Sequence, residues 1–205
     1  LATPVIAIRI ANALMPAHQS IRLDELQPVD LIVVFDGDNR RGRVAEALRA
    51  SREWPSAPIV ILGDVWIRDQ LQAAGIPDSM LSRDSGPTTT LEQTEALGTY
   101  AGSSHVLRHV GVIASRLQVP RLRAFAETLG LTSLEFLPSP VDVEPNGEGI
   151  DGWTPKYVAL RMSRDAIYEH AAMAYYRWKG VIKSGSYSVE AAMSHPRVIP
   201  ADQKD

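Results

Sequence analysis

Short runs of apolar, mostly β-branched residues alternate with longer segments of helical periodicity, and this alternation limits the fold more than any other feature of the chain. The clearest runs are Leu31–Phe35, Ile59–Leu62 and Val110–Ala114. Each is too short for a typical helix and has no polar residue, which is typical of a strand buried on both faces of a sheet. Weaker signals predict two further strands over Ser79–Leu81 and Leu134–Leu137. The chain therefore carries five predicted strands.

Helical segments separate these strands. We predict helices in the N-terminal stretch LATPVIAIRIANALM, over residues 41–52, 66–74 and 119–129, in a segment that Thr90 opens, and from Ser163 to Gly180. Strands that alternate with helices indicate βαβ units and hence a parallel sheet. With right-handed crossovers we favour the strand order 3-2-1-4-5, in which the first and fourth strands are central neighbours. The predicted fold is Rossmann-like α/β: a single open, mostly parallel five-stranded sheet with helices on both faces.

Residues at the ends of the predicted helices fit capping roles. Asp64 is a candidate N-cap, and Gly75 a left-handed stop, for the helix at 66–74. Thr90 and Gln93 have the spacing of a capping box. The last helix is expected to pack on its own domain through one apolar face, formed by Ile167, Ala171, Ala174, Tyr175 and Trp178.

Composition favours one globular domain. The chain has 205 residues, 45% of them apolar, and a formal net charge of -3, which gives no electrostatic footprint for nucleic acid. We divide it into an N-terminal helix and connector (1–27), the α/β domain (28–180) and a loosely ordered C-terminal tail (181–205). The absence of cysteine excludes disulfides, thiolate metal sites and cysteine nucleophiles.

Membrane association is not excluded by the sequence. No run of about 18 apolar residues is present. The chain begins at Leu1 without methionine, which leaves open a membrane tether upstream of residue 1. The oligomeric state is also left open.

Two polar loops follow the first and fourth predicted strands, FDGDNRRGR and ASRLQVPR. In open α/β sheets, ligands bind beyond the carboxyl ends of such neighbouring strands, and the helix N-termini there favour anions. Loops after the second and third strands can add to the wall. The candidate ligand-binding residues are Asp36, Gly37, Asp38, Arg43, Gly63, Asp84, Thr90, Ser115, Gln118 and Arg121.

Each of these residues also has a simpler interpretation. Asp36 or Asp38 alone fits the cap of the following helix. Arg43 fits the solvated face of that helix as well as an anion clamp. Taken singly, Ser115 fits a turn and Arg121 a surface charge. Their placement at one predicted crevice favours a ligand site.

Several nucleotide and catalytic motifs are missing. The chain has no GxGxxG after its first strand, no Walker phosphate loop and no GxSxG nucleophile elbow. His105 and His109 are close in sequence but have no third ligand in view, so no metal site is assigned. Asp36 and Asp38 leave a divalent cation open, because carboxylate oxygens suit such ions. The cofactor is otherwise unknown.

At these residues the chain resembles the ElyC/SanA/YdcF family of bacterial domains of unknown function. VDLIVVFDGDNRRGRVAEAL is similar to the family's first strand and helix, with Arg43 at its arginine position, and PIVILGD to the next strand. TTLEQ is a looser counterpart of the family's "NT.EN" helix start. IASRLQVPRLRA places Ser115, Pro120 and Arg121 on family positions, and YEHAAMAYYRWKG is similar to the closing helix. The resemblance covers about residues 28–180.

The resemblance implies a place in bacterial envelope biogenesis, often with membrane segments before the domain, although a cytoplasmic location is not excluded. Two departures separate the chain from the family pattern: Gln118 stands at the family's histidine and Thr89 at the asparagine of "NT". An amide does not titrate near neutral pH, so glutamine cannot replace a general acid or base. It can still donate and accept hydrogen bonds.

The lead hypothesis is an envelope-associated domain that binds a small phosphate-bearing or other anionic ligand at the ends of the first and fourth strands. Arg43 and Arg121 would clamp the anion, while Ser115 and Gln118 orient it.

Two other hypotheses stay open. One is a hydrolase or transferase acting on such a ligand, for which the candidate catalytic residues are Asp36, Asp38 and Gln118. The other is a non-catalytic interaction module that docks on a partner through its C-terminal aromatic helix, with Tyr175, Tyr176 and Trp178.

Overall fold

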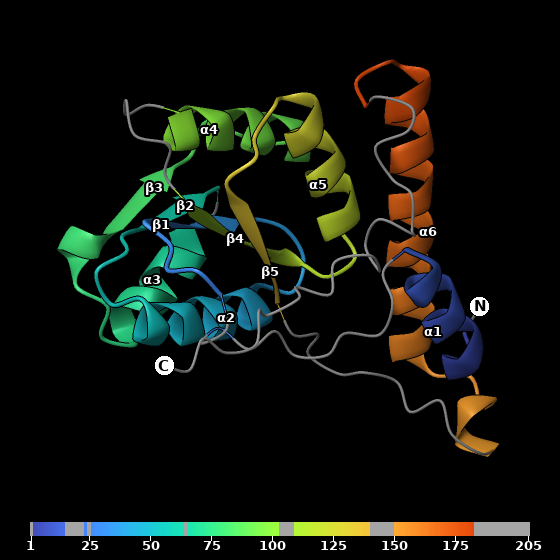
Figure 1. Ribbon diagram of the computed structural model, residues 1–205. Coiled ribbons are helices and arrows are strands. Elements are labelled where there is room, and N and C mark those ends of the chain that lie inside the picture. The colour runs from blue at the N-terminus through green and yellow to red at the C-terminus, as the bar shows by residue number, and fades with distance from the viewer. Residues whose placement is uncertain are drawn as a thin grey trace, which may run out of the picture.

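The computed structural model describes residues 2–14, 23, 26–63, 65–102, 109–139 and 150–182. Its centre is one five-stranded sheet in which all strands are parallel (Figure 1). The strands are β1 (Leu31–Phe35), β2 (Ile59–Leu62), β3 (Leu81–Asp84), β4 (Val110–Ser115) and β5 (Leu134–Ser139). Their order is β3-β2-β1-β4-β5. The predicted fold class and strand order are confirmed.

Helices cover both faces of the sheet. They are α1 (Pro4–Leu14), α2 (Arg40–Glu53), α3 (Val65–Ala73), α4 (Thr90–Gly102), α5 (Val119–Thr128) and α6 (Tyr157–Trp178). Two of them, α2 and α3, lie on one face, and α4 and α5 lie on the other (Figure 1). Along β1, Ile32 and Val34 belong to one apolar cluster and Leu31, Val33 and Phe35 to the other. The central strand is therefore apolar throughout because each face has its own core.

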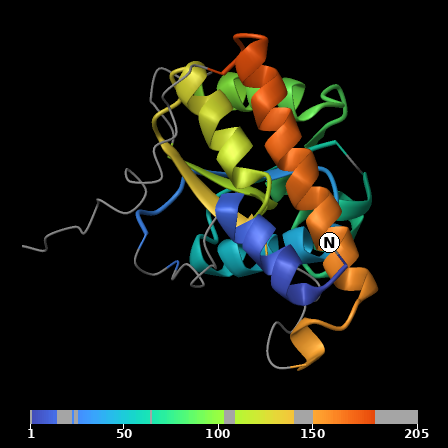
Figure 2. The same ribbon diagram turned by 90° about the vertical axis from the view of Figure 1, so that its right-hand side faces the viewer.

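The helices α1 and α6 form a pair beside the sheet (Figure 2). Ala11 and Leu14 of α1 pack with Ala166 of α6 and with Leu117, just before α5. The Arg116 guanidinium donates a 2.8 Å hydrogen bond to the side-chain oxygen of Asn12. These contacts bring α6 against the end of the sheet that carries the two polar loops. No helix in the described ranges is long and apolar enough to cross a membrane.

The edge strands differ from the prediction at their ends. β3 runs from Leu81 to Asp84 because Asp78–Met80 form a short 3-10 helix, so the expected start at Ser79 and the expected end at Leu81 are both wrong. β5 continues through Pro138 to Ser139, so the expected end at Leu137 is also wrong. An edge strand tolerates proline because one side of its backbone needs no ladder partner.

The last helix differs more. It begins at Tyr157 rather than Ser163. The face that was expected to pack inward is exposed at all five positions: Ile167, Ala171, Ala174, Tyr175 and Trp178. Instead, Ala159, Ala166 and Glu169 are buried. The small alanines allow α1 to approach closely, and Glu169 is buried because Arg121 pairs with it. Because α6 carries apolar residues on both sides, periodicity alone predicted the wrong side to be buried.

Helix ends agree in part. Gly75 has φ +97°, the left-handed stop that was expected. The capping box lies one residue earlier than predicted: Thr89 Oγ1 accepts from the Glu92 amide at 3.3 Å, and Glu92 Oε2 accepts from the Thr89 amide at 3.0 Å. Hydrogen bonds from Thr88 and Thr89 lower the pKa of Glu92. Gln93 instead donates to the carbonyl of Leu62. The predicted cap at Asp64 lies outside the described residues.

Candidate functional site

The loop Asp36–Asn39 carries the chain from the end of β1 into α2. Gly37 has φ +137° and Asn39 has φ +61°, so the chain turns through two positive-φ residues. Asparagine is among the few non-glycine residues that adopt this conformation readily. The Gly37 amide donates to Asp36 Oδ1 at 2.6 Å. The loop thus holds Asp36 and Asp38 beyond the carboxyl end of the sheet.

Arg43 lies under this loop and is fully buried, with 0% exposure. Its guanidinium donates to the Asp38 carbonyl at 2.9 Å, to the Phe35 carbonyl at 2.5 Å and to Gln118 Oε1 at 2.8 Å. Burial lowers the pKa of Arg43 to about 10, against the opposing effect of the Asp36 and Asp38 carboxylates. The side chain is therefore still a cation at neutral pH, and it fixes the loop from below rather than lining the surface above it.

Gln118 joins the two predicted loops. It is the N-cap of α5, and its amide donates to the Ser115 carbonyl at 2.9 Å. Because Oε1 accepts from Arg43, the side-chain Nε2 is turned toward Gly37, where it lies 3.3 Å from the position a Cβ would occupy. Gln118 thus couples the end of β4 to the end of β1.

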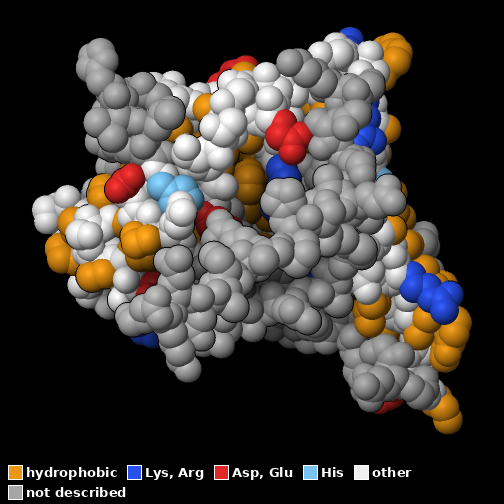
Figure 3. Space-filling view, viewed as in Figure 1, with side chains coloured by type: hydrophobic (Ala, Val, Ile, Leu, Met, Phe, Trp, Pro, Cys, Tyr) orange, Lys and Arg blue, Asp and Glu red, His pale blue; other side chains and the backbone are white. Residues whose placement is uncertain are grey.

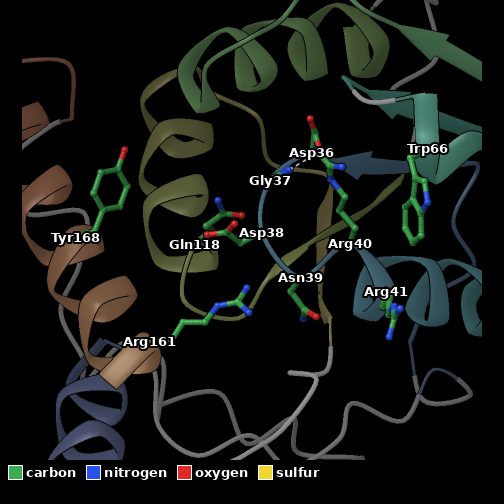
Figure 4. A pocket seen from close by; sticks show the side chains of 10 residues that line it. All are labelled: Asp36, Gly37, Asp38, Asn39, Arg40, Arg41, Trp66, Gln118, Arg161 and Tyr168. Carbon is green, nitrogen blue, oxygen red and sulfur yellow. Dashed lines mark hydrogen bonds and ion pairs between the residues drawn. The ribbon is translucent and has the colours of Figure 1, made fainter. Parts of the chain in front are cut away.

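The two loops share one open crevice of about 790 Å3 (Figure 4). It is lined by Asp36, Gly37, Asp38, Asn39, Arg40, Arg41, Trp66, Gln118, Arg161 and Tyr168. Three arginines and two aspartates supply the charge. Arg40 and Arg41 come from the first turn of α2, and Arg161 comes from α6 on the opposite side (Figure 4). The crevice is a mixed-charge site with a cationic excess.

The ion pairs that the two aspartates make with described residues are long. Arg40 Nε lies 3.9 Å from Asp36 Oδ1, and an Arg164 terminal nitrogen lies 3.8 Å from Asp38 Oδ2. Such pairs on half-exposed side chains contribute little to stability, about 0–1 kcal/mol. Arg161 is similar, with its Nε 3.9 Å from Asp165 Oδ2. The charged rim can therefore rearrange around a ligand at small cost.

Arg121 does not line the crevice. Its guanidinium makes two hydrogen bonds to Glu169, at 2.8 and 2.9 Å, and both side chains are buried. The ring of Tyr168, which does line the crevice, lies 5.8 Å from the Arg121 guanidinium carbon. The position of Arg121 thus does not support the predicted contact with an anion. The Arg121 side chain instead packs behind Tyr168, in the wall of the crevice.

Four other predicted site residues also lie outside the lining: Gly63, Asp84, Thr90 and Ser115. Asp84 Oδ1 accepts from the Gly86 amide at 2.9 Å, which stabilises its own turn. Thr90 is the first residue of α4, and its carbonyl accepts from Thr94. Ser115 ends β4 in register with Ser139. Gly63 does not line the crevice itself, but it lies directly beside Asp36, which does.

Sequence reasoning missed six of the ten lining residues. Asn39, Arg40 and Arg41 are adjacent to the predicted residues in DNRRGR and had a readable signal there. Trp66, Arg161 and Tyr168 had none. They reach the crevice only because α3 and α6 pack at this end of the sheet, and the placement of α6 cannot be read from a single amphipathic pattern.

Metal ligands do not gather here. Within the described ranges, no three His, Cys, Asp or Glu side chains are placed to hold a metal ion. His109 lies at the other end of β4, where its Nδ1 is 3.0 Å from the Pro28 carbonyl, and His105 is outside the described residues. A cation beside Asp36 and Asp38 would therefore need oxygen ligands from a bound molecule.

No protein-family model matches the chain, and no curated protein matches it. The resemblance to the ElyC/SanA/YdcF family stays a prediction from the motifs.

Gly63→Ala is expected to lower the free energy of unfolding by about 2–4 kcal/mol, since left-handed strain alone costs about 1–3 kcal/mol. Gly63 has φ +119°, and an added Cβ would lie 2.5 Å from the Cβ of Asp36. Urea denaturation measures the loss. The matched control is Gly75→Ala, at φ +97° with nothing within 4 Å, where only the strain applies. Equal losses in both variants would contradict the close approach to Asp36.

Proposed function

We propose that the protein binds a small phosphate-bearing or other anionic ligand in the crevice at the carboxyl ends of β1 and β4. The observation that carries this proposal is that Arg40 and Arg41 from α2 and Arg161 from α6 line one crevice from opposite sides (Figure 4). Guanidinium groups offer paired N–H donors that match the oxygens of a phosphate or carboxylate.

The charge around the crevice supports an anion. Three arginines outnumber the carboxylates of Asp36 and Asp38, and the buried Arg43 adds a fourth cation under the loop. The first turn of α2 also directs the positive end of its helix dipole toward this loop. Arg43 pairs with two carbonyls and an amide rather than with a carboxylate, so its charge is not neutralised by direct contact.

Gln118 supports binding by hydrogen bonds rather than by proton transfer. Its carbonyl oxygen is held by Arg43, which leaves its Nε2 group on the crevice side beside Gly37. An amide donor at this place can orient an anion without a change of protonation. Tyr168 and Trp66 border the crevice at its two ends (Figure 4), so the ligand has room for an apolar or planar part beside its charged group.

Arg41→Gln and Arg161→Gln are each expected to weaken anion binding about tenfold or more, because a charged hydrogen bond contributes about 1.5–3 kcal/mol. Calorimetric titration with inorganic phosphate and pyrophosphate measures this effect. The matched control is Arg52→Gln, which removes the same charge from the last turn of α2, far from the crevice. If all three variants bind like the wild type, or if Arg52→Gln weakens binding equally, the crevice is not the anion site.

A catalytic role has one specific observation in its favour: Asp36 and Asp38 line the same crevice as the arginines. The second candidate function is therefore a hydrolase or transferase acting on the bound anion, with one of these carboxylates as general base or as part of a magnesium site completed by the ligand. Assays with phosphoesters and sugar phosphates in the presence of magnesium test it. If the protein turns over one of these substrates, and if Asp38→Asn abolishes the turnover but retains binding, the protein is an enzyme and not only a binding protein.

Envelope association belongs to the proposal as well. It rests on the motif resemblance alone.

A further inference from the structure

The outer face of α6 carries an apolar stripe at heptad spacing. Seven positions separated alternately by three and four residues are all exposed: Tyr157, Leu160, Arg164, Ile167, Ala171, Ala174 and Trp178. We call this set the outer seam. Six of the seven are apolar or aromatic, and alternate spacing of this kind is the pattern by which one helix packs along another. The inner face of the same helix already packs on α1 and α5.

The exposed residues of the outer seam extend along the whole length of α6. Figure 2 shows α6 lengthwise at the front of the molecule, with α1 beside it. Figure 3 shows hydrophobic side chains gathered along the right-hand edge, where these two helices lie. The 22 residues of α6 make a rod of about 33 Å. An apolar surface of this length on a folded domain marks an interaction site.

We propose that the outer seam is a self-association surface, on which α6 of a second copy of this chain packs in the antiparallel direction. This inference goes beyond anion binding and does not rest on it. Arg161 and Tyr168, which line the crevice, lie on the stripe next to the seam. The paired helices would therefore border the two crevices without filling them.

The area on offer reaches what a specific interface needs. Three aromatic side chains on this side of α6 lie outside the lining of the crevice and are 51–79% exposed: Tyr157, Tyr175 and Trp178. Since such a side chain covers about 150–250 Å2, they present on the order of 400 Å2 in each copy. Two copies would bury about 800 Å2 through these residues, and Leu160 and Ile167 bring the total to about 1,000 Å2, the lower bound for a specific interface.

The distribution of large and small residues selects the antiparallel direction. In a parallel pair, Ala171 and Ala174 would face their own copies and leave gaps, and Arg164 would face Arg164. In an antiparallel pair with a/d layers in register, Arg164 faces Ala174 and Ile167 faces Ala171. Each alanine then receives a large side chain, as close packing requires. The one charged residue of the seam also has room to extend its guanidinium to solvent.

Sedimentation of the whole chain across the micromolar range tests the proposal, with a concentration-dependent dimer as the expected result. Ile167→Lys would place two lysines at the centre of the seam and is expected to raise the dissociation constant at least about a hundredfold. The matched control is Leu129→Lys at the end of α5, since Leu129 and Ile167 are similarly exposed (46% and 43%). Circular dichroism verifies that both variants are folded. A dimer that Ile167→Lys leaves intact would overturn the proposal.

Disulfide trapping tests the direction, because the chain has no cysteine of its own. Arg164→Cys and Ala174→Cys are expected to cross-link only when the two proteins are mixed, since these positions face each other in the antiparallel pair. Cross-linking of either variant with itself would contradict the antiparallel arrangement. A wild-type chain that stays monomeric overturns the proposal. If that monomer also pelleted with phosphatidylglycerol vesicles, the seam would instead be a lipid-binding face.

Discussion

Arg121→Met is expected to lower the free energy of unfolding by about 3–5 kcal/mol, because it leaves a buried carboxylate without its partner. Arg121 and Glu169 are only 3% and 4% exposed and share two hydrogen bonds of 2.8 and 2.9 Å. The pair joins α5 to α6 at a place where the remaining contact between these helices is the small cluster around Phe125 and Met173. Urea denaturation of the single variant gives the size of the loss.

The pH dependence of this loss has a definite sign. Burial raises the pKa of Glu169, and Arg121 opposes that rise. Without Arg121, the folded protein holds a proton on Glu169 more readily than the unfolded chain does. A raised carboxyl pKa favours the folded state at low pH, and this advantage is lost as pH rises through the folded pKa. The deficit of Arg121→Met is therefore expected to be smaller at acidic than at alkaline pH.

The double variant Arg121→Met/Glu169→Met is the control. Replacing both charges by side chains of similar length removes the buried carboxylate along with its partner, so most of the lost stability should return. A double variant as unstable as the single one would show that the pair acts through its shape and not through its charge. Anion binding should also be measured in both variants. It shows whether the wall of the crevice is intact, because Tyr168 lines the crevice and its ring lies near Arg121.

Much of the fold was predictable because the central strands leave little choice. Leu31–Phe35 and Ile59–Leu62 are apolar at every position, and both are buried on both faces. The right-handed rule for crossovers then restricts the strand order. The ends of the edge strands were not predictable to the same degree. At β5 a proline reads as a loop in sequence, yet it fits an edge strand that needs no further partner.

The candidate site was predictable only where one strand leads directly into its own loop. Asp36, Asp38 and Gln118 were placed in this way, and all three line the crevice. Arg161 and Tyr168 depend instead on where α6 packs, which the buried Arg121–Glu169 pair and the alanines toward α1 decide. Two charged residues far apart in sequence read as separate surface charges, and their pairing is visible only in three dimensions.

Arg43→Met is expected to weaken anion binding in the crevice at least about tenfold although Arg43 does not line it, and to destabilise the fold by about 3 kcal/mol. Three acceptors lose their donor: the carbonyls of Phe35 and Asp38 and the Oε1 atom of Gln118. Each buried acceptor left unpaired costs about 1–3 kcal/mol. Against this, burial lowers the pKa of Arg43 to about 10, which corresponds to a cost of about 3 kcal/mol for burying the cation, and the variant avoids this cost.

Two effects of Arg43→Met on stability oppose each other: acceptors lose their donor, and the cost of burying the cation disappears. The loss of anion binding is therefore a clearer measure than the loss of stability. The guanidinium links the Asp36–Asn39 loop to Gln118 through hydrogen bonds to both. Without it, the donors around the crevice lose this shared anchor, and an anion must order them on binding. Arg43→Lys should fail as well, because one compact ammonium cannot span three acceptors in a fork. Gly75→Ala is the control, since it lowers stability through backbone strain after the end of α3 and leaves the lining of the crevice unchanged. Calorimetry showing full phosphate affinity in Arg43→Met would mean that the loop holds its shape unaided.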